Sequence, residues 1–202
     1  MASRSGVAAM DETLRTRLDA LCAEGWAISH RFDVEVREHH FHPFVAADYQ
    51  VVLKALVPLR GRGLRFLEWG SATGVITIMA DLLGFEAYGI ELDSSLVGTA
   101  HGLAKRFTSG ARFAAGSFLP TGYRWQPSDG DGRTGTLGTG VSGYLQLGHP
   151  LDDFDIVFGY PWGGEEAMML DLMKRYGRPD ALLLLHTVND GVKSYRGGRD
   201  VT

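Results

Sequence analysis

The sequence predicts one α/β domain in which helices cover both faces of a mostly parallel sheet. From residue 64 onwards, apolar runs of strand length alternate with helical patterns, an order typical of parallel sheets with helical crossovers. The length of 202 residues fits a single domain. Hydrophobic residues make up 45% of the chain and charged residues 22%, which is ordinary for a globular protein.

The lead-in, residues 1–63, carries three expected elements. Residues 11–24 show a helical apolar stripe that Gly25 can end. Residues 32–37 alternate apolar and charged side chains, which predicts a short strand. A second helix is expected to begin after a capping Asp48.

The core is expected to span residues 64–187. Its helices are predicted at 73–84, 94–107 and 164–176, and its strands at 64–69, 86–91, 111–116, 154–159 and 180–187. Residues 121–150 interrupt this pattern and contain eight of the 27 glycines. Such a stretch buries little apolar area, so it is expected to be loop or partly disordered. Two interpretations of this segment are possible: a flap that covers a site, or an insertion exposed to solvent.

Charge and cysteine content narrow the function classes. The net charge is −4, and Lys and Arg form no run, which disfavours a large nucleic-acid partner. Cys22 is the one cysteine of the chain, so an internal disulfide is excluded, as fits the reducing cytoplasm. No apolar run approaches the roughly 18 residues that a membrane helix needs. We expect a cytoplasmic protein without a membrane partner.

The loop after the first core strand combines an acid with glycines. It reads Glu68-Trp69-Gly70-Ser71-Ala72-Thr73-Gly74. Gly70 permits a tight turn, Ala72 lets a ligand approach the backbone, and Gly74 lets the next helix pack closely. Taken alone, Glu68 could be a surface or helix-capping carboxylate, and Gly70 and Gly74 could be simple turn glycines.

Glu91 adds a second acid in register with this loop. It lies 21 residues after Gly70, at the end of the second strand. An acid at that distance can accept hydrogen bonds from both hydroxyls of a ribose. The loop and Glu91 together favour a cofactor that contains a nucleoside.

The order of these motifs resembles the class I S-adenosylmethionine-dependent methyltransferases. Motif I of that family is (D/E)-x-G-x-G-x-G, and here Glu68 precedes Gly-x-Ala-x-Gly. The dinucleotide fingerprint G-x-G-x-x-G fits poorly, because Val75 stands at its third glycine. The resemblance covers residues 64–187. It implies a Rossmann-like, doubly wound, three-layer αβα fold with S-adenosylmethionine as cofactor and methyl transfer as activity.

The resemblance also implies roles for individual residues. The cofactor-binding set is Glu68, Gly70, Ser71, Ala72, Gly74, Glu91, Leu92, Ser117, Phe118 and Tyr49. The glycine loop would contact the methionine end of the cofactor, and Glu91 the ribose. Ser117 stands where the family often has an Asp that touches the adenine, and Phe118 would pack on that ring. The segment before motif I often closes over the cofactor, and Phe44 and Asp48 are further candidates there.

The fourth strand ends in Gly159-Tyr160-Pro161-Trp162. This sequence resembles the (D/N/S)-P-P-(Y/F/W) motif of amino methyltransferases, with Gly159 replacing the polar residue and Tyr160 the first proline. These departures leave the acceptor open, as a small or planar molecule. Trp162 would either stack on a flat acceptor or pack within the protein.

Candidate catalytic residues are Asp155, Tyr160, Trp162 and His186, with Glu165 and Glu166 as further possible bases. His186 follows the apolar run of the last core strand and is either a general base or a satisfied buried histidine. Three histidines cluster at positions 39, 40 and 42. No matching Cys or carboxylate spacing accompanies them, so no metal site is predicted.

Only 15 residues follow Thr187. The methyltransferase sheet usually has seven strands, the last two in an antiparallel hairpin, so we expect the C-terminal strands to be shortened or missing. An uncovered sheet edge would favour a homodimer, which a strictly monomeric mass in light scattering would exclude. Two other functions remain open: a non-catalytic module that binds S-adenosylmethionine, and a nicotinamide-dependent oxidoreductase.

Overall fold

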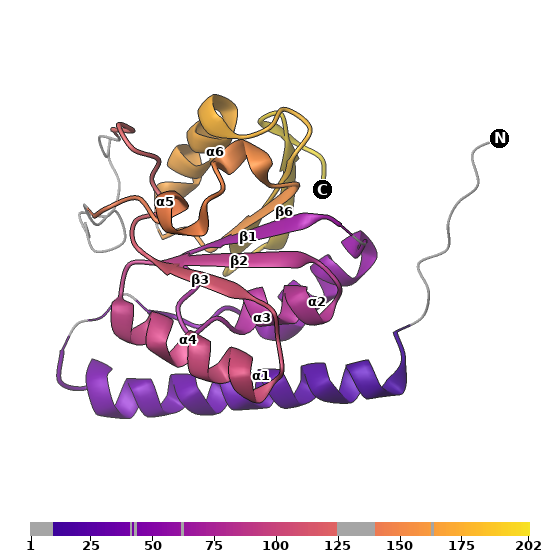
Figure 1. Ribbon diagram of the computed structural model, residues 1–202, viewed down its shortest axis with the longest axis vertical. Coiled ribbons are helices and arrows are strands. Elements are labelled where there is room, and N and C mark those ends of the chain that lie inside the picture. Colours follow the sequence, from indigo (N-terminus) through magenta and orange to yellow (C-terminus); the bar gives the residue numbers. More distant parts are fainter. Residues whose placement is uncertain (1–9, 41, 43, 62, 125–139, 163) are drawn as a thin grey trace.

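The computed structural model describes residues 10–40, 42, 44–61, 63–124, 140–162 and 164–202. A seven-stranded sheet in the order β3-β2-β1-β4-β5-β6-β7 forms its centre (Figure 1). Neighbouring strands from β3 to β5 pair in parallel, whereas β6 and β7 pair antiparallel. The strands are β1 Arg65–Trp69, β2 Glu86–Glu91, β3 Arg112–Ala115, β4 Ile156–Gly159, β5 Leu182–Thr187, β6 Gly191–Arg196 and β7 Arg199–Asp200. The mostly parallel α/β fold is confirmed.

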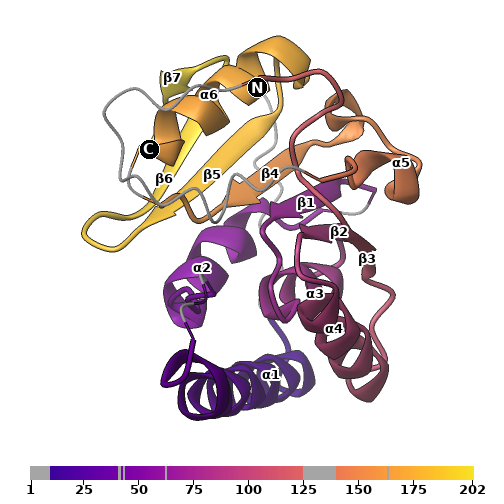
Figure 2. The same ribbon diagram turned by 90° about the vertical axis from the view of Figure 1, so that its left-hand side faces the viewer.

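Helices cover both faces of this sheet (Figures 1 and 2). One face carries α2 (Tyr49–Leu56), α3 (Val75–Leu82) and α4 (Ser94–Arg106), and the other carries α5 (Tyr144–Leu147) and α6 (Glu165–Tyr176). The long α1 (Glu12–Phe32) packs on α3 and forms an outer layer beyond the expected three. Three shorter turns complete the helical segments: η1 Asp33–Arg37, η2 Val57–Leu59 and η3 Leu151–Asp153.

Strand residues alternate between two apolar cores, as the period of two in a β-strand requires. Phe66 of β1 belongs to the core under α1 to α4, whereas its neighbour Leu67 belongs to the core under α5 and α6. Phe158 and Val157 of β4 divide in the same way. The sheet is therefore buried on both faces, and its ligand-accessible groups lie at the strand ends.

The prediction for the lead-in is wrong at two points. The first helix does not end at Gly25 but continues to Phe32, and residues 33–37 form a π-helical turn instead of a strand. A Cβ at Gly25 would lie 2.8 Å from Val75 Cγ2 and 2.9 Å from Tyr49 Cε2. This glycine therefore serves close packing of α1 against α2 and α3, not helix termination. The alternating residues 32–37 do not pair with any described strand, so their alternation does not produce a β-strand.

The C-terminal prediction is partly wrong. The residues after β5 add two strands to the sheet, so no strand of the usual seven is missing, although β7 is shortened to two residues. The chain saves length by turning directly from β5 into β6 and from β6 into β7. Gly197 and Gly198 both have positive φ and form the last turn. The homodimer remains a prediction.

The glycine-rich segment lies only partly within the described residues, because 125–139 fall outside them. The described end of the segment packs on the core. Ser142 forms a parallel bridge with Ser117, directly after β3, and α5 follows at once. A Cβ at Gly116 would lie 2.6 Å from the Val141 carbonyl oxygen. Residues 140–147 are therefore an integral cover of the β3 end.

Candidate active site

A cavity of about 580 Å³ opens at the carboxyl ends of the parallel strands. Volumes of about 300–1,000 Å³ are typical of sites for small ligands and cofactors. All five parallel strands contribute to its wall, either through their last residues or through the loops that follow them. Parallel α/β sheets bind ligands at this edge, and the glycine loop and Glu91 lie here together.

The loop between β1 and α3 forms one wall. Gly70, Ala72 and Gly74 all have positive φ, at 68°, 45° and 80°. A Cβ at Gly70 would meet nothing within 4 Å, whereas one at Gly74 would lie 2.7 Å from Phe113 Cζ and 2.8 Å from Ala100 Cβ. Gly74 does not line the cavity, in contrast to Gly70, Ser71 and Ala72. Its absent side chain lets α3 approach β3 and α4.

Glu68 is buried at the end of β1 and lines the cavity. Its Oε2 accepts hydrogen bonds from the Thr77 amide at 2.9 Å and the Thr77 hydroxyl at 2.5 Å. Burial raises the pKa of Glu68 to about 8, and the nearby charge of Glu91 acts in the same direction, against the Thr77 hydrogen bonds. Without a bound cation, this carboxyl is therefore largely protonated at neutral pH.

Glu91 joins the first two strand ends. Its Oε2 accepts a hydrogen bond from the Ala72 amide at 2.8 Å, and its Oε1 accepts one from the Asp93 amide at 2.9 Å. Burial raises its pKa, and its backbone hydrogen bonds oppose the shift. The carboxylate thereby fixes the β1 loop next to the start of α4. Glu91 itself lines the cavity.

The cavity is acidic. Four carboxylic acids line it, Glu68, Glu91, Asp93 and Glu165, and none of its described lining residues is Lys or Arg. A pyrophosphate would be repelled by this arrangement, and a ligand with positive charge would be attracted. His42 is the one basic side chain among the described lining residues, and its Nε2 lies 3.0 Å from Asp93 Oδ2.

The end of β3 supplies an aromatic wall. Ser117 and Phe118, which follow β3, line the cavity, as does Leu92 after β2. The ring of Phe118 stacks on Trp69, with centroids 5.5 Å apart, and the Trp69 indole donates a hydrogen bond to the Tyr144 hydroxyl. Sequence reasoning missed Trp69 as a site residue. Its place directly after Glu68 in motif I was the available signal.

The segment before α2 and the first residue of that helix form a further part of the cavity wall. His42, Phe44 and Tyr49 line the cavity, whereas Asp48 caps α2 by accepting from the Gln50 and Val51 amides. The Phe44 amide donates to His42 Nδ1, so His42 Nε2 carries the proton and donates to Asp93. We call residues 42 and 44–49 the strap. Its hydrogen bond to Asp93 ties it to the end of β2.

The loop after β4 forms the opposite wall. Tyr160, Trp162 and Glu165 line the cavity, and the Trp162 amide donates to Glu165 Oε2 at 2.9 Å. His186 does not line it. The imidazole is buried and lies edge-on to Tyr160, with centroids 4.7 Å apart, and its Nδ1 has no partner among the described residues. Burial lowers its pKa. The unpartnered Nδ1 does not fit a satisfied buried histidine, and the imidazole lies outside the cavity lining, so neither role expected from the sequence is supported.

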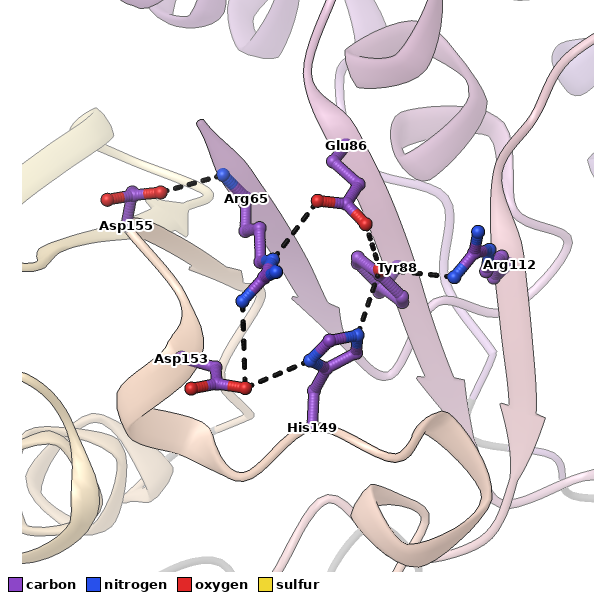
Figure 3. A network of polar contacts seen from close by, with 7 residues as sticks. All are labelled: Arg65, Glu86, Tyr88, Arg112, His149, Asp153 and Asp155. Atoms are coloured by element: carbon purple, nitrogen blue, oxygen red, sulfur yellow. Dashed lines mark hydrogen bonds and ion pairs between the residues drawn. The ribbon is translucent and has the colours of Figure 1, made fainter. Parts of the chain in front are cut away.

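Asp155 is a correction, because it lies at the opposite edge of the sheet. It precedes β4, so it stands at the amino end of that strand (Figure 3). Its Oδ2 accepts from the Arg65 amide and its Oδ1 from Arg178. The prediction placed Asp155 near the end of a strand but did not distinguish the amino end of β4 from its carboxyl end, where the cavity lies. Glu166 is also outside the cavity lining and accepts a hydrogen bond from Tyr195.

The histidine cluster at positions 39, 40 and 42 divides between an exposed turn and the cavity wall. His39 and His40 are exposed on the turn after the π-helix. No group of three or more His, Cys, Asp or Glu side chains that could hold a metal ion occurs within the described parts of the chain. Among the described helices, none is long and apolar enough to cross a bilayer.

Comparison with known proteins gives the fold a name. No protein-family profile and no curated protein sequence matches the chain. The precorrin-6Y C5,15-methyltransferase of Geobacter metallireducens matches with TM-score 0.50 and 18% identity, over 77% of this chain and 70% of that one. An RNA methyltransferase from Salinibacter ruber, in complex with S-adenosyl-L-homocysteine, matches with TM-score 0.52 and 16% identity, over 70% and 76%.

A protein assigned as an O-methyltransferase from Klebsiella pneumoniae is similar over a larger part of the chain. It matches with TM-score 0.51 and 19% identity, over 91% of this chain and 69% of that one. The three proteins differ in the acceptors that their names state, so the likeness concerns the fold and not the acceptor. The chain has the Rossmann-like fold of the class I S-adenosylmethionine-dependent methyltransferases.

Proposed function

We propose that this protein is an S-adenosylmethionine-dependent methyltransferase that acts on a small or planar acceptor. The observation that carries the proposal is the convergence of the glycine loop after β1 with Glu91 at the end of β2, beside one cavity. In folds of this kind, an acid at the end of the second strand accepts hydrogen bonds from the ribose, and small residues after the first strand let the ligand approach the backbone.

The residues of the cavity fit this cofactor. The Ser71 hydroxyl is buried, lines the cavity and has no hydrogen-bond partner among the described residues. A buried unpaired hydroxyl costs free energy until a ligand supplies a partner. Gly70 leaves open space where a side chain would stand. A positively charged ligand would favour the ionised forms of Glu68 and Glu91, so this pair suits a ligand with a sulfonium and an ammonium group better than a nicotinamide dinucleotide.

The proposed roles follow the strand order. Glu91 would accept hydrogen bonds from the ribose hydroxyls, and Phe118 would pack beside the base. Glu68, Ser71 and Ala72 would surround the amino-acid end. The bound cofactor would supply a methyl group on a positively charged sulfur. The protein then has to exclude water and align the acceptor, which the strap and the loop after β4 can do.

Calorimetry with S-adenosylmethionine and S-adenosylhomocysteine tests the cofactor. We expect both to bind and NAD to fail, and Glu91→Ala to weaken binding at least tenfold. Glu86→Ala is the matched control, because Glu86 begins the same strand but lies outside the cavity. Failure of both cofactors to bind would refute the proposal, and tight NAD binding would favour the oxidoreductase.

Methyl transfer requires a separate measurement. A donor with a labelled methyl group is incubated with extracts of small molecules, and label is followed into any acceptor. Transfer that Glu91→Ala abolishes and Glu86→Ala retains supports the enzyme. Cofactor binding with no transfer to any acceptor would favour the non-catalytic binding module, for which the loss of the polar residue at Gly159 is the specific motive.

A further inference from the structure

The half of the cavity at the ends of β4 and β5 has no role in the proposed cofactor contacts. Its wall comes from Tyr160, Trp162 and Glu165, together with Met169 of α6 and Val188 after β5. Val188 is exposed to solvent, with 80% of its surface accessible. This half is therefore open at one side and apolar or aromatic over most of its wall, which suits the entry of a small acceptor.

Glu165 is the carboxylic acid of this wall. It is 6% exposed, although it begins a surface helix. Its Oε2 accepts from the Trp162 amide, and its own amide donates to the Trp162 carbonyl at 2.9 Å. The two residues are thereby fixed relative to each other. Burial raises the pKa of Glu165, and the backbone hydrogen bond opposes this shift; its place in the first turn of α6 also favours the ionised form.

The charge of the whole cavity restricts what can bind beside Glu165. No described lining residue is Lys or Arg, so an anionic acceptor would meet only negative or neutral groups. A cation gains from the buried carboxylate by Coulomb attraction and from an aromatic face by cation–π attraction. A neutral alcohol gains neither to the same degree.

We propose that this half of the cavity binds a small amine as its ammonium ion, with Glu165 accepting a hydrogen bond from the nitrogen and Trp162 facing the apolar body of the molecule. The inference rests on the proposed function and names its acceptor class as primary or secondary amines. The Glu165 carboxylate takes one ammonium proton, the freed lone pair forms the N–CH₃ bond, and the S–CH₃ bond breaks with its electron pair on sulfur.

Three probes that differ mainly in charge test the subsite. They are 2-phenylethylamine, 2-phenylethanol and phenylacetate, titrated into the protein with saturating S-adenosylhomocysteine. We expect the amine to bind at least tenfold more tightly than the alcohol, and phenylacetate to show no binding. Equal binding of amine and alcohol, or preferred binding of phenylacetate, would overturn the proposal. So would the failure of all amines from methylamine to tryptamine.

Variants separate recognition of charge from a merely structural role. Glu165→Gln should reduce the preference for amine over alcohol to less than threefold while the alcohol still binds as before. A role limited to holding Trp162 would weaken both probes equally and leave their ratio unchanged, which contradicts the proposal. Glu166→Gln is the matched control, because this neighbouring acid lies outside the cavity lining, and it should keep the wild-type ratio.

The same titrations distinguish the two levels of inference. If S-adenosylhomocysteine fails to bind, the proposed function fails, and the amine series is repeated on the protein alone to test the charge selectivity independently. If S-adenosylhomocysteine binds and the amine preference is absent, the methyltransferase proposal stands and the amine subsite is rejected.

Discussion

The two edges of the sheet both carry acidic side chains, but these have different kinds of partner. At the amino edge, Figure 3 shows a closed network: Arg65 pairs with Glu86 and Asp153, and the Tyr88 hydroxyl contacts Glu86, His149 and Arg112. At the carboxyl edge, the acids of the cavity accept hydrogen bonds from backbone amides and a threonine hydroxyl.

The pKa directions record this difference. Hydrogen bonds from Tyr88 and Arg65 lower the pKa of Glu86, whereas burial raises the pKa values of Glu68, Glu91 and Glu165. Acids with cationic partners within the protein stabilise the fold. Glu68 and Glu91 are buried, and their described contacts are backbone amides and Thr77, which favours binding of a cation beside them. Perturbed groups of this kind mark functional sites. Four predictions test this distinction.

The largest effect is expected at Gly74, which supports the cavity edge. Gly74→Ala places a Cβ within 2.7 Å of Phe113 and 2.8 Å of Ala100, at a φ of 80°. Strain and overpacking should lower the free energy of unfolding by about 2–4 kcal/mol and abolish cofactor binding. Chemical denaturation and calorimetry measure the two effects.

Gly98→Ala is the control for this substitution. Gly98 lies in α4, and an added Cβ meets nothing within 4 Å. The control should raise the free energy of unfolding by about 0.5–1 kcal/mol, because alanine favours the helix. Equal effects of the two substitutions would show that Gly74 does not have the packing role assigned to it.

The second prediction concerns the pH dependence of stability through Glu68. Its folded pKa is raised from 4.5 to about 8, so its protonated form is the stable one in the fold. The contribution is complete below pH 4.5 and is lost as the pH rises to about 8, at up to about 1.4 kcal/mol per pH unit. Glu91 and Tyr49 face the same carboxyl.

Glu68→Gln should remove this slope and leave those of the other groups. The difference in free energy of unfolding between wild type and variant, measured by denaturation from pH 5 to pH 8, isolates it. A constant difference across that range would show that Glu68 stays ionised. Glu86→Gln, at the amino edge, should not abolish the wild-type decline with rising pH, because its pKa is shifted in the opposite direction.

The sequence predicted the strands and helices of the core well because their signals are local. Apolar runs locate β1, β2 and β4 to within two residues of the observed bounds, and the order of motifs placed Glu68 and Glu91 at one cavity. The failures depend on contacts distant in sequence. Gly25 was predicted to end the first helix because its packing partners, Tyr49 and Val75, are distant in sequence and could not be recognised from its local context. Asp155 was misplaced because a run of residues does not show where pairing begins.

The third prediction tests the amino edge. Tyr88→Phe removes the hydroxyl that contacts Glu86 at 2.5 Å and His149 at 3.1 Å. We expect a loss of about 1–2 kcal/mol in the free energy of unfolding, because two partly buried hydrogen bonds are lost, one of them to the Glu86 carboxylate. Cofactor affinity should not change, as measured by calorimetry. A tenfold loss of affinity with unchanged stability would contradict the separation of the two edges.

The smallest effect is expected at the hydrogen bond between His42 and Asp93, which joins the strap to the end of β2. Their side chains are partly exposed, at 20% and 35%, so loss of this hydrogen bond in His42→Leu should cost about 0.5–1 kcal/mol in the free energy of unfolding. The variant also frees the strap from the end of β2. Dissociation of S-adenosylhomocysteine should therefore accelerate about threefold in stopped-flow measurements. His39→Leu, on the exposed turn nearby, should leave the rate unchanged. An unchanged rate in His42→Leu would mean that apolar contacts alone hold the strap. The Asp93 carboxylate would then have no role in holding it, and the contrast with the paired acids of the amino edge would apply to every acid that lines the cavity.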